Sequence, residues 1–225
     1  MTLRYKSIIK LKYEIEGILD LLNSDLGKSI VNGVSGSTVN DSSKTSSVLT
    51  MALPVLMKGM ERSAATPEGA EWLMGALSNK HDGSILDNLG GLFGGGVDNS
   101  IKQDGAGILG HILGAKQQGV QQVIGQKAGL DAGSVGEILK ITAPILMGYL
   151  GKQKKASNAS SSGDLTGLLG GLLGGSSADN NQSFLEKVLD ADGDGSVVDD
   201  LAGMFLGADK KKSGLGGMLG GMFGK

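Results

Sequence analysis

The chain has 225 residues, enough for one large domain or two small ones with a real hydrophobic core. It contains no cysteine, which excludes disulfides, thiolate zinc sites and thiol nucleophiles. Its net charge of −2 removes any whole-protein attraction to DNA, RNA or anionic lipid, so we expect no nucleic-acid partner.

Residues 1–16 form a charged N-terminal extension. Lysines and glutamates interrupt its apolar runs, and no small-residue cleavage site follows, so we expect no signal peptide. No apolar run in the chain reaches the roughly 20 residues that a membrane-spanning helix requires. We therefore expect a cytoplasmic protein without a membrane span.

The chain contains an internal repeat that is clearest around two prolines. The segment VLTMALPVLM (Val48 to Met57) matches ILKITAPILM (Ile138 to Met147), and Pro54 and Pro144 occupy the same place, 90 residues apart. The shared apolar positions follow the i, i+3, i+4, i+7 spacing of a buried helix face. Because proline lacks an N–H donor and clashes with the preceding turn, we expect both helices to kink or break there.

Two further pairs of segments match at a larger offset. Trp72–Gly91 matches Phe184–Gly203 at an offset of 112, and Gly107–Gly114 resembles Gly217–Gly224 at an offset of 110. The change from 90 to 112 predicts an insertion of 22 residues in the second copy. Residues 152–182 are rich in serine and glycine, so we interpret them as a flexible linker that contains this insertion.

These segments predict an all-α, multihelical fold with two pseudo-repeated helical units. The first unit covers residues 26–96; the second starts with 116–151 and is completed, after the linker, by 183–207. Each unit is expected to contain a helix, a proline-containing helix, a third helix, a short helix and a glycine-rich segment. A Gly/Met-rich tail follows over 208–225. No stretch alternates apolar and polar residues at period two, so no strand is predicted.

The segment DADGDGSVVDDL, from Asp190 to Leu201, follows the opening of an EF-hand calcium loop. Its candidate ligands all offer oxygen donors around a glycine turn: Asp190, Asp192, Asp194, Ser196, Asp199 and Asp200. The closing position should be a bidentate glutamate and is Leu201. In the first copy, Ser78 and Lys80 replace the first two carboxylates although DGS-x-x-D is kept, which is typical of a helix cap. Calcium binding and an acidic, solvated turn therefore both stay open.

The two histidines and the glycine tracts complete the candidate features. His81 is expected in a turn and His111 in a glycine-rich helix; neither has a spaced partner for zinc, so a capping or surface role is favoured over catalysis. The tracts LGGLFGGG, LTGLLGGLLGG and LGGMLGGMFG carry small residues at spacing four. We expect partly ordered segments that associate with protein surfaces, with weakly ordered linkers and membrane contact as the alternatives.

Several blocks of the sequence described above resemble the YidB-like family of bacterial proteins of unknown function. The matching blocks are LLNSDLGKSIVNGVSG, SVLTMALPVLMKGM, TPEGAEWLMGAL, HDGSILDNLGGLFGGG, DGAGILGHILGAKQ and SVGEILKITAPILMGYLGKQ. They define a helical domain over residues 17–151. The resemblance implies a multihelical fold and a bacterial source. It transfers no activity and no catalytic residue, and the N-terminal extension and the later residues lie outside it.

The sequence thus favours a non-catalytic structural or interaction protein that binds an unknown protein partner or itself. A calcium ion at the acidic loop is the one cofactor that the residues suggest. The alternative is a carrier of a small apolar ligand or lipid, with an adaptable cavity lined by methionines: Met51, Met57, Met60, Met74 and Met147. No acid, base and nucleophile occur together, so we do not expect an enzyme.

Overall fold

A computed structural model describes residues 17–174, and this part of the chain is built of helices without a strand. The predicted all-α, multihelical class is confirmed. The elements are α2 (Ile18–Asn23), α3 (Asp25–Gly36), α4 (Ser42–Ala64), α5 (Pro67–Asn79), α6 (Ser84–Asp87), α7 (Leu89–Gly94), α8 (Asn99–Leu113), the 3-10 turn η1 (Gly114–Lys116), α9 (Gln117–Ala128), α10 (Ala132–Ser157) and α11 (Ser162–Gly174).

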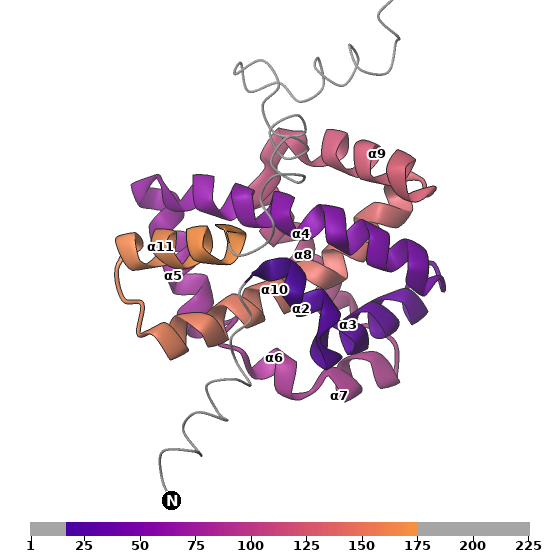
Figure 1. Cartoon of the computed structure of the whole chain (residues 1–225), viewed down its shortest axis with the longest axis horizontal. Coiled ribbons are helices and arrows are strands. Elements are labelled where there is room, and N and C mark those ends of the chain that lie inside the picture. Colours follow the sequence, from indigo (N-terminus) through magenta and orange to yellow (C-terminus); the bar gives the residue numbers. More distant parts are fainter. Residues whose placement is uncertain (1–16, 175–225) are drawn as a thin grey trace, which may run out of the picture.

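The two proline-containing helices, α4 and α10, form the centre of the fold, and the other helices pack around them (Figure 1). α10 is buried on nearly every side between Ile138 and Gly151. Such a helix must be apolar around its whole circumference, which explains why its sequence lacks the polar face of a surface helix. Core residues of α4 and α10 are fully buried at positions 90 residues apart: Val48 and Ile138, Leu49 and Leu139, Val55 and Ile145, Leu56 and Leu146, and Met57 and Met147.

α4 and α10 also begin alike. The carboxylate of Asp41 accepts a hydrogen bond from the Lys44 amide at 3.0 Å, and that of Asp131 accepts one from the Ser134 amide at 2.9 Å. These two N-caps, 90 residues apart, each satisfy an amide that the first helical turn leaves without a partner. The N-caps and the prolines of α4 and α10 are thus both 90 residues apart, as the predicted repeat requires. The later residues of the second unit lie outside the described part, so the two-unit organisation stays a prediction.

Both helices continue through their prolines, so the expected break does not occur. Pro144 cannot donate to the carbonyl of Lys140, one turn earlier. The backbone of Gly105 in α8 packs directly on this carbonyl, so closely that a side chain at Gly105 would overlap it. The carbonyl that proline leaves free therefore lies where α8 and α10 pack closely, and the absence of a Cβ at Gly105 makes this approach possible.

Residues 152–174 differ from the predicted flexible linker. Residues 152–157 continue α10, and α11 follows after a short turn and packs on α4, with further contacts to α5 and α10 (Figure 1). The rest of the predicted linker, 175–182, lies outside the described residues. The serine- and glycine-rich composition hid a helix because glycine lowers helix propensity without preventing a helix whose leucines are buried.

Two local signals explain α11. Ser161 and Asp164 form a capping box: the Asp164 amide donates to Ser161 Oγ at 3.1 Å, and the Ser161 amide donates to the Asp164 carboxylate at 2.9 Å. Leu165, Leu169 and Leu172 then fall on one face at helical spacing, and all three are buried in the core. In the described part of the segment that was predicted to contain the insertion, the chain thus forms an additional core helix.

Candidate functional site

The segment between α5 and α8 crosses the surface of the fold as a strap, which we define as residues 82–95. It contains the short helices α6 and α7, and neither helix buries a residue. The strap is nevertheless attached at defined points, because glycines on the helices beneath it allow close contact.

At its beginning the strap lies on α10. Gly83 has φ +106°, a left-handed conformation that favours glycine, and it turns the chain over Gly148 and Lys152. The Ile85 side chain fills the space that a Cβ on Gly148 would need, and the carbonyl of His81 occupies the corresponding space at Gly151. A larger residue at either glycine would push this end of the strap outward.

Two ion pairs join the same end of the strap to α10. Lys155 Nζ lies 2.8 Å from the Asp82 carboxylate, and Lys152 Nζ lies 3.8 Å from that of Asp87. The Lys155 ammonium, together with the hydroxyl and amide of Ser84, holds the pKa of Asp82 well below its usual range. All these groups are exposed, so the pairs orient the strap more than they stabilise the fold.

At its other end the strap lies on α3. The Phe93 ring packs directly on Gly33, where a Cβ would overlap it. Between the two ends, the Asn88 side chain accepts a hydrogen bond from the Gly91 amide at 3.2 Å and caps α7. The strap-binding surface is therefore Gly33 on α3 together with Gly148, Gly151, Lys152 and Lys155 on α10.

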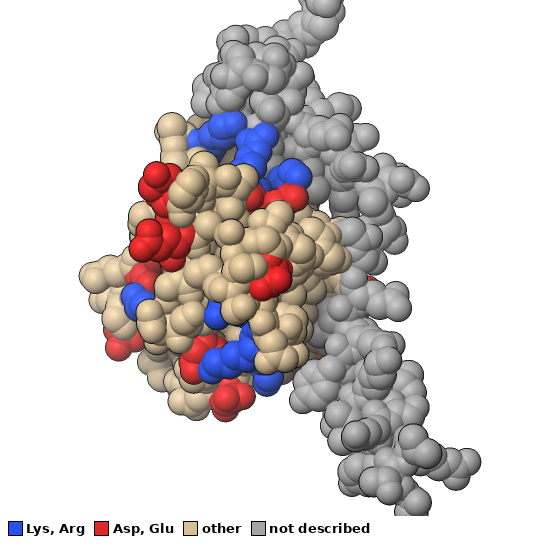
Figure 2. Space-filling model, turned by 90° about the vertical axis from the view of Figure 1, so that its left-hand side faces the viewer, with Lys and Arg blue, Asp and Glu red and all other residues tan. Residues whose placement is uncertain are grey.

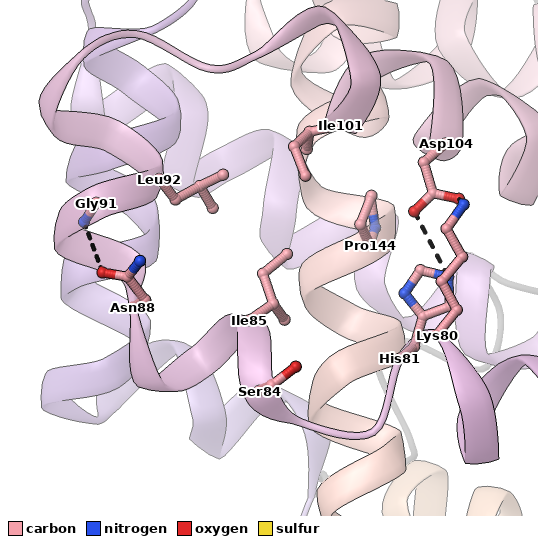
Figure 3. A pocket seen from close by; sticks show the side chains of 10 residues that line it. All are labelled: Lys80, His81, Ser84, Ile85, Asn88, Gly91, Leu92, Ile101, Asp104 and Pro144. Carbon is pink, nitrogen blue, oxygen red and sulfur yellow. Dashed lines mark hydrogen bonds and ion pairs between the residues drawn. The ribbon is translucent and has the colours of Figure 1, made fainter.

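An open pocket of about 440 Å³, the strap pocket, lies between the strap and the helices α8 and α10. Figure 3 shows apolar side chains in its middle and polar groups toward its two ends. The apolar lining residues are Ile85, Leu92, Ile101 and Pro144, and the others are Lys80, His81, Ser84, Asn88, Gly91 and Asp104. An apolar middle between polar groups is the usual make-up of a binding pocket.

A buried histidine and a shared carboxylate form one end of the strap pocket. His81 Nε2 lies 3.5 Å from one oxygen of Asp104, and Lys80 Nζ lies 2.5 Å from the other (Figure 3). The His81 side chain is only 6% exposed. Burial lowers the pKa of His81; Asp104 opposes this effect and Lys80 adds to it. The imidazole is therefore neutral at pH 7, and it can donate a hydrogen bond at one nitrogen and accept one at the other.

The expected position of His81 is only half right, and its role stays a prediction. It lies in a turn, as expected, but it is buried rather than at the surface. Sequence reasoning missed its partner Asp104, which follows it by 23 residues on another helix, so no local spacing indicated the pair. His111 is exposed on α8, and its ring stacks on Trp72 of α5 with ring centres 4.4 Å apart.

The predicted calcium ligands lie outside the described residues: Asp190, Asp192, Asp194, Ser196, Asp199 and Asp200. Within residues 17–174, no three His, Asp or Glu side chains are grouped closely enough to hold a metal ion. None of the described helices is long and apolar enough to cross a membrane. Figure 2 shows acidic and basic side chains interspersed with uncharged residues on the face at the left of Figure 1.

The five methionines proposed to line a ligand cavity do not line the strap pocket. Met57, Met60 and Met147 are fully buried in the core, and Met51 and Met74 are partly buried against it. They fill space between helices, which is the usual role of this flexible side chain.

A family model described as a bacterial protein of unknown function, DUF937, matches residues 20–153. The chain belongs to this family. The YidB-like resemblance agrees with this membership. The DUF937 match contains the strap and every residue that lines the strap pocket, whereas α11 lies beyond its end. No curated protein and no solved structure matches the chain.

Proposed function

We propose that this DUF937 protein is a cytoplasmic, non-catalytic interaction protein that binds a partner protein at the strap pocket. The observation that supports the proposal is the strap itself. It forms one wall of an open pocket with an apolar middle, yet its helices bury no residue. Such a wall can adjust to a partner at little cost in free energy, because segments with few buried contacts open locally most easily.

The lining residues define the chemistry of the partner. An apolar side chain of the partner would enter between Ile85, Leu92 and Ile101, which are all half-buried. Polar groups of the partner backbone would meet the Ser84 hydroxyl and the neutral His81 at the margins. The net charge of −2 gives the pocket no general attraction for polyanions, so we keep the expectation of a protein rather than a nucleic acid.

The test is affinity purification of the tagged full chain from its native cell, with two variants measured in parallel. Ile101→Arg introduces a charge into the apolar middle of the pocket, and Gln122→Arg introduces the same charge on the exposed face of α9. Both variants are first checked by their melting curves. We expect specific partners to be retained by the wild type and by Gln122→Arg, and reduced about tenfold by Ile101→Arg. Equal retention by the two variants would contradict the proposal.

We also propose that the acidic loop of the C-terminal part binds calcium and stabilises the protein. The support is the D-x-D-x-D-G pattern from Asp190 onward, although Leu201 stands where the closing glutamate belongs. Calorimetric titration of the full chain with calcium should give heat and a raised melting temperature, and Asp192→Ala should abolish both. If the wild type gives neither, the loop is an acidic turn.

A small apolar ligand or lipid is the second candidate for the strap pocket. Its support is the apolar middle of the pocket, which replaces the methionine cavity expected from the sequence. Native mass spectrometry of the purified chain tests it. A bound molecule that is present in the wild type and absent from Ile101→Arg would favour the carrier function over the protein partner.

The matching registers of α3–α4 and α9–α10 support a further proposal, that the chain contains two copies of one helical unit. In each copy a helix precedes an Asp N-cap and a long buried helix with an internal proline. Equal spacing of caps, prolines and buried positions over two helices is what duplication would leave.

A further inference from the structure

The sequence of the strap occurs twice in the chain. Residues 82–95 read DGSILDNLGGLFGG and residues 194–207 read DGSVVDDLAGMFLG, with eight of the 14 positions identical. We call residues 194–207 the second strap. It lies outside the described residues, and only its sequence corresponds to that of the first strap.

The side chains that attach the first strap to the fold have equivalents in the second. The two carboxylates that pair with α10, Asp82 and Asp87, correspond to Asp194 and Asp199. The glycine of the left-handed turn is kept as Gly195, the residue packed on Gly148 becomes Val197, and the aromatic residue packed on Gly33 is kept as Phe205. The second strap therefore has the same two carboxylates, the same glycine after the first of them, and similar apolar residues at the positions that contact the fold in the first strap.

The strap-binding surface, in contrast, occurs once. If the two units were equivalent throughout, the second strap would lie on the residues of α4 and α9 that correspond to Gly148, Gly151 and Gly33. Ninety residues away, these are Lys58, Glu61 and Val123. Each carries a side chain where the first strap requires none, so a main chain cannot approach as closely there.

We propose that the second strap binds the strap-binding surface of its own chain in exchange with the first strap. The chain then has two segments that compete for one site, and occupation by the second strap frees residues 82–95 and removes one wall of the strap pocket. This exchange goes beyond the proposed partner binding and does not depend on it. It concerns the calcium-free chain, because Asp194 and Asp199 are also among the proposed calcium ligands, and its tests are therefore run with a chelator present.

The segment that joins the second strap to α11 favours binding within the same molecule. Residues 175–193 join α11 to the second strap. Nineteen residues reach at most about 65 Å when extended. A tether of this length gives an effective concentration far above that of a second chain in dilute solution. Releasing the first strap exposes side chains that are only partly buried against the core, such as Ile85, Leu92 and Phe93, and no fully buried residue of α6 or α7, which limits the cost in free energy.

The test uses cysteine pairs, for which this chain is suited because it has no cysteine of its own. Lys155→Cys is combined with Asp194→Cys in the full chain, and a short bismaleimide cross-links thiols that come close. Lys155→Cys with Asp82→Cys is the positive control, because these side chains form an ion pair. Lys155→Cys with Asp179→Cys is the matched negative control, because Asp179 lies nearer to α11 along the chain but outside the repeated sequence.

We expect the Asp194→Cys pair to give a monomeric cross-linked species at about five times the yield of the Asp179→Cys pair or more, since specific binding raises the local concentration of one thiol. Equal yields for the two pairs would overturn the proposal. Cross-linking that produces only dimers would overturn the assignment to the same chain.

A second measurement tests competition for the site. Phe93→Ala removes the contact of the first strap with Gly33, so it should raise the Asp194→Cys cross-linking yield. Phe205→Ala weakens the second strap only and should lower that yield. If neither substitution changes the yield, the two straps do not share the surface and the proposal fails.

Discussion

α8 and the strap both pack on α10, and both approach its backbone where one partner is a glycine. They differ in what they bury. α8 contributes Ile108, Leu109 and Leu113 to the core, whereas the helices of the strap contribute no buried residue. Glycine thus permits a close approach to α10 in both regions, but only α8 also buries whole apolar side chains, which stabilise its contact with the core much more strongly. α8 is part of the fold, and the strap is a segment held on it.

The largest effect that tests this comparison is expected at Gly105. A methyl group there would overlap the Lys140 carbonyl, and neither buried backbone can retreat. We expect Gly105→Ala to lower the free energy of unfolding by about 3 kcal/mol or more. Urea unfolding measures the change. Gly107→Ala, two residues away with open space around it, is the control and should stabilise α8 by roughly 0.5–1 kcal/mol. A mild effect at Gly105 would mean that α8 is held as loosely as the strap.

α11 provides the next test of whether buried apolar side chains hold a segment in the fold. Its Ser/Gly-rich composition is typical of a linker, but three of its leucines are buried in the core. Leu169→Ala should lower the free energy of unfolding by about 2–4 kcal/mol, because the side chain is fully buried. Leu168→Ala, at a half-buried position on the same helix, should cost clearly less. Equal and small losses for both variants would show that α11 does not belong to the cooperative unit.

A smaller effect is expected at Gly148, beneath the strap. A methyl group there meets the end of the Ile85 side chain rather than a backbone, so the strap can shift outward. We expect Gly148→Ala to change the free energy of unfolding by about 1 kcal/mol or less. It should also speed amide hydrogen exchange in residues 82–95 while leaving α8 unchanged. Faster exchange in α8 as well would show that the two regions open together.

The smallest effect concerns His81. Burial lowers the pKa of His81 in the folded protein below its unfolded value, so the unfolded state binds the proton more readily. The stability associated with the neutral imidazole is complete above the unfolded value, near pH 6.5, and is lost as the pH falls toward the folded value. The difference in urea midpoint between pH 7.5 and 5.5 should shrink in His81→Gln. A difference that is as large in His81→Gln as in the wild type would contradict this expectation.

The helical class and the central pair of helices, α4 and α10, could be predicted from the sequence, because apolar spacing is a local and periodic signal. Apolar residues around Pro54 and Pro144 recur at helical spacing, and the structure places both segments in buried helices. The continuity of these helices could not be derived, because it depends on long-range packing that includes the contact between Gly105 and the freed Lys140 carbonyl.

The candidate site was less accessible to sequence reasoning. The sequence predicts a turn at His81, but the burial of His81 and its pairing with Asp104 arise from the packing of this turn and α8 on α10. The Ser/Gly composition suggested a linker where α11 forms, although the capping box at Ser161 and Asp164 and the leucines at spacing four and three were local signals. Weighting caps and apolar spacing above composition would have predicted that helix.

The strap also joins the two halves of the described fold, α2–α5 before it and α8–α11 after it. Its apolar residues are only partly buried against the core, so a single proteolytic cut within it would leave the fully buried residues of both halves in place. The two fragments would still share the interfaces of α4 with α8, α9, α10 and α11. The molecule is therefore suited to reconstitution from two separately expressed pieces.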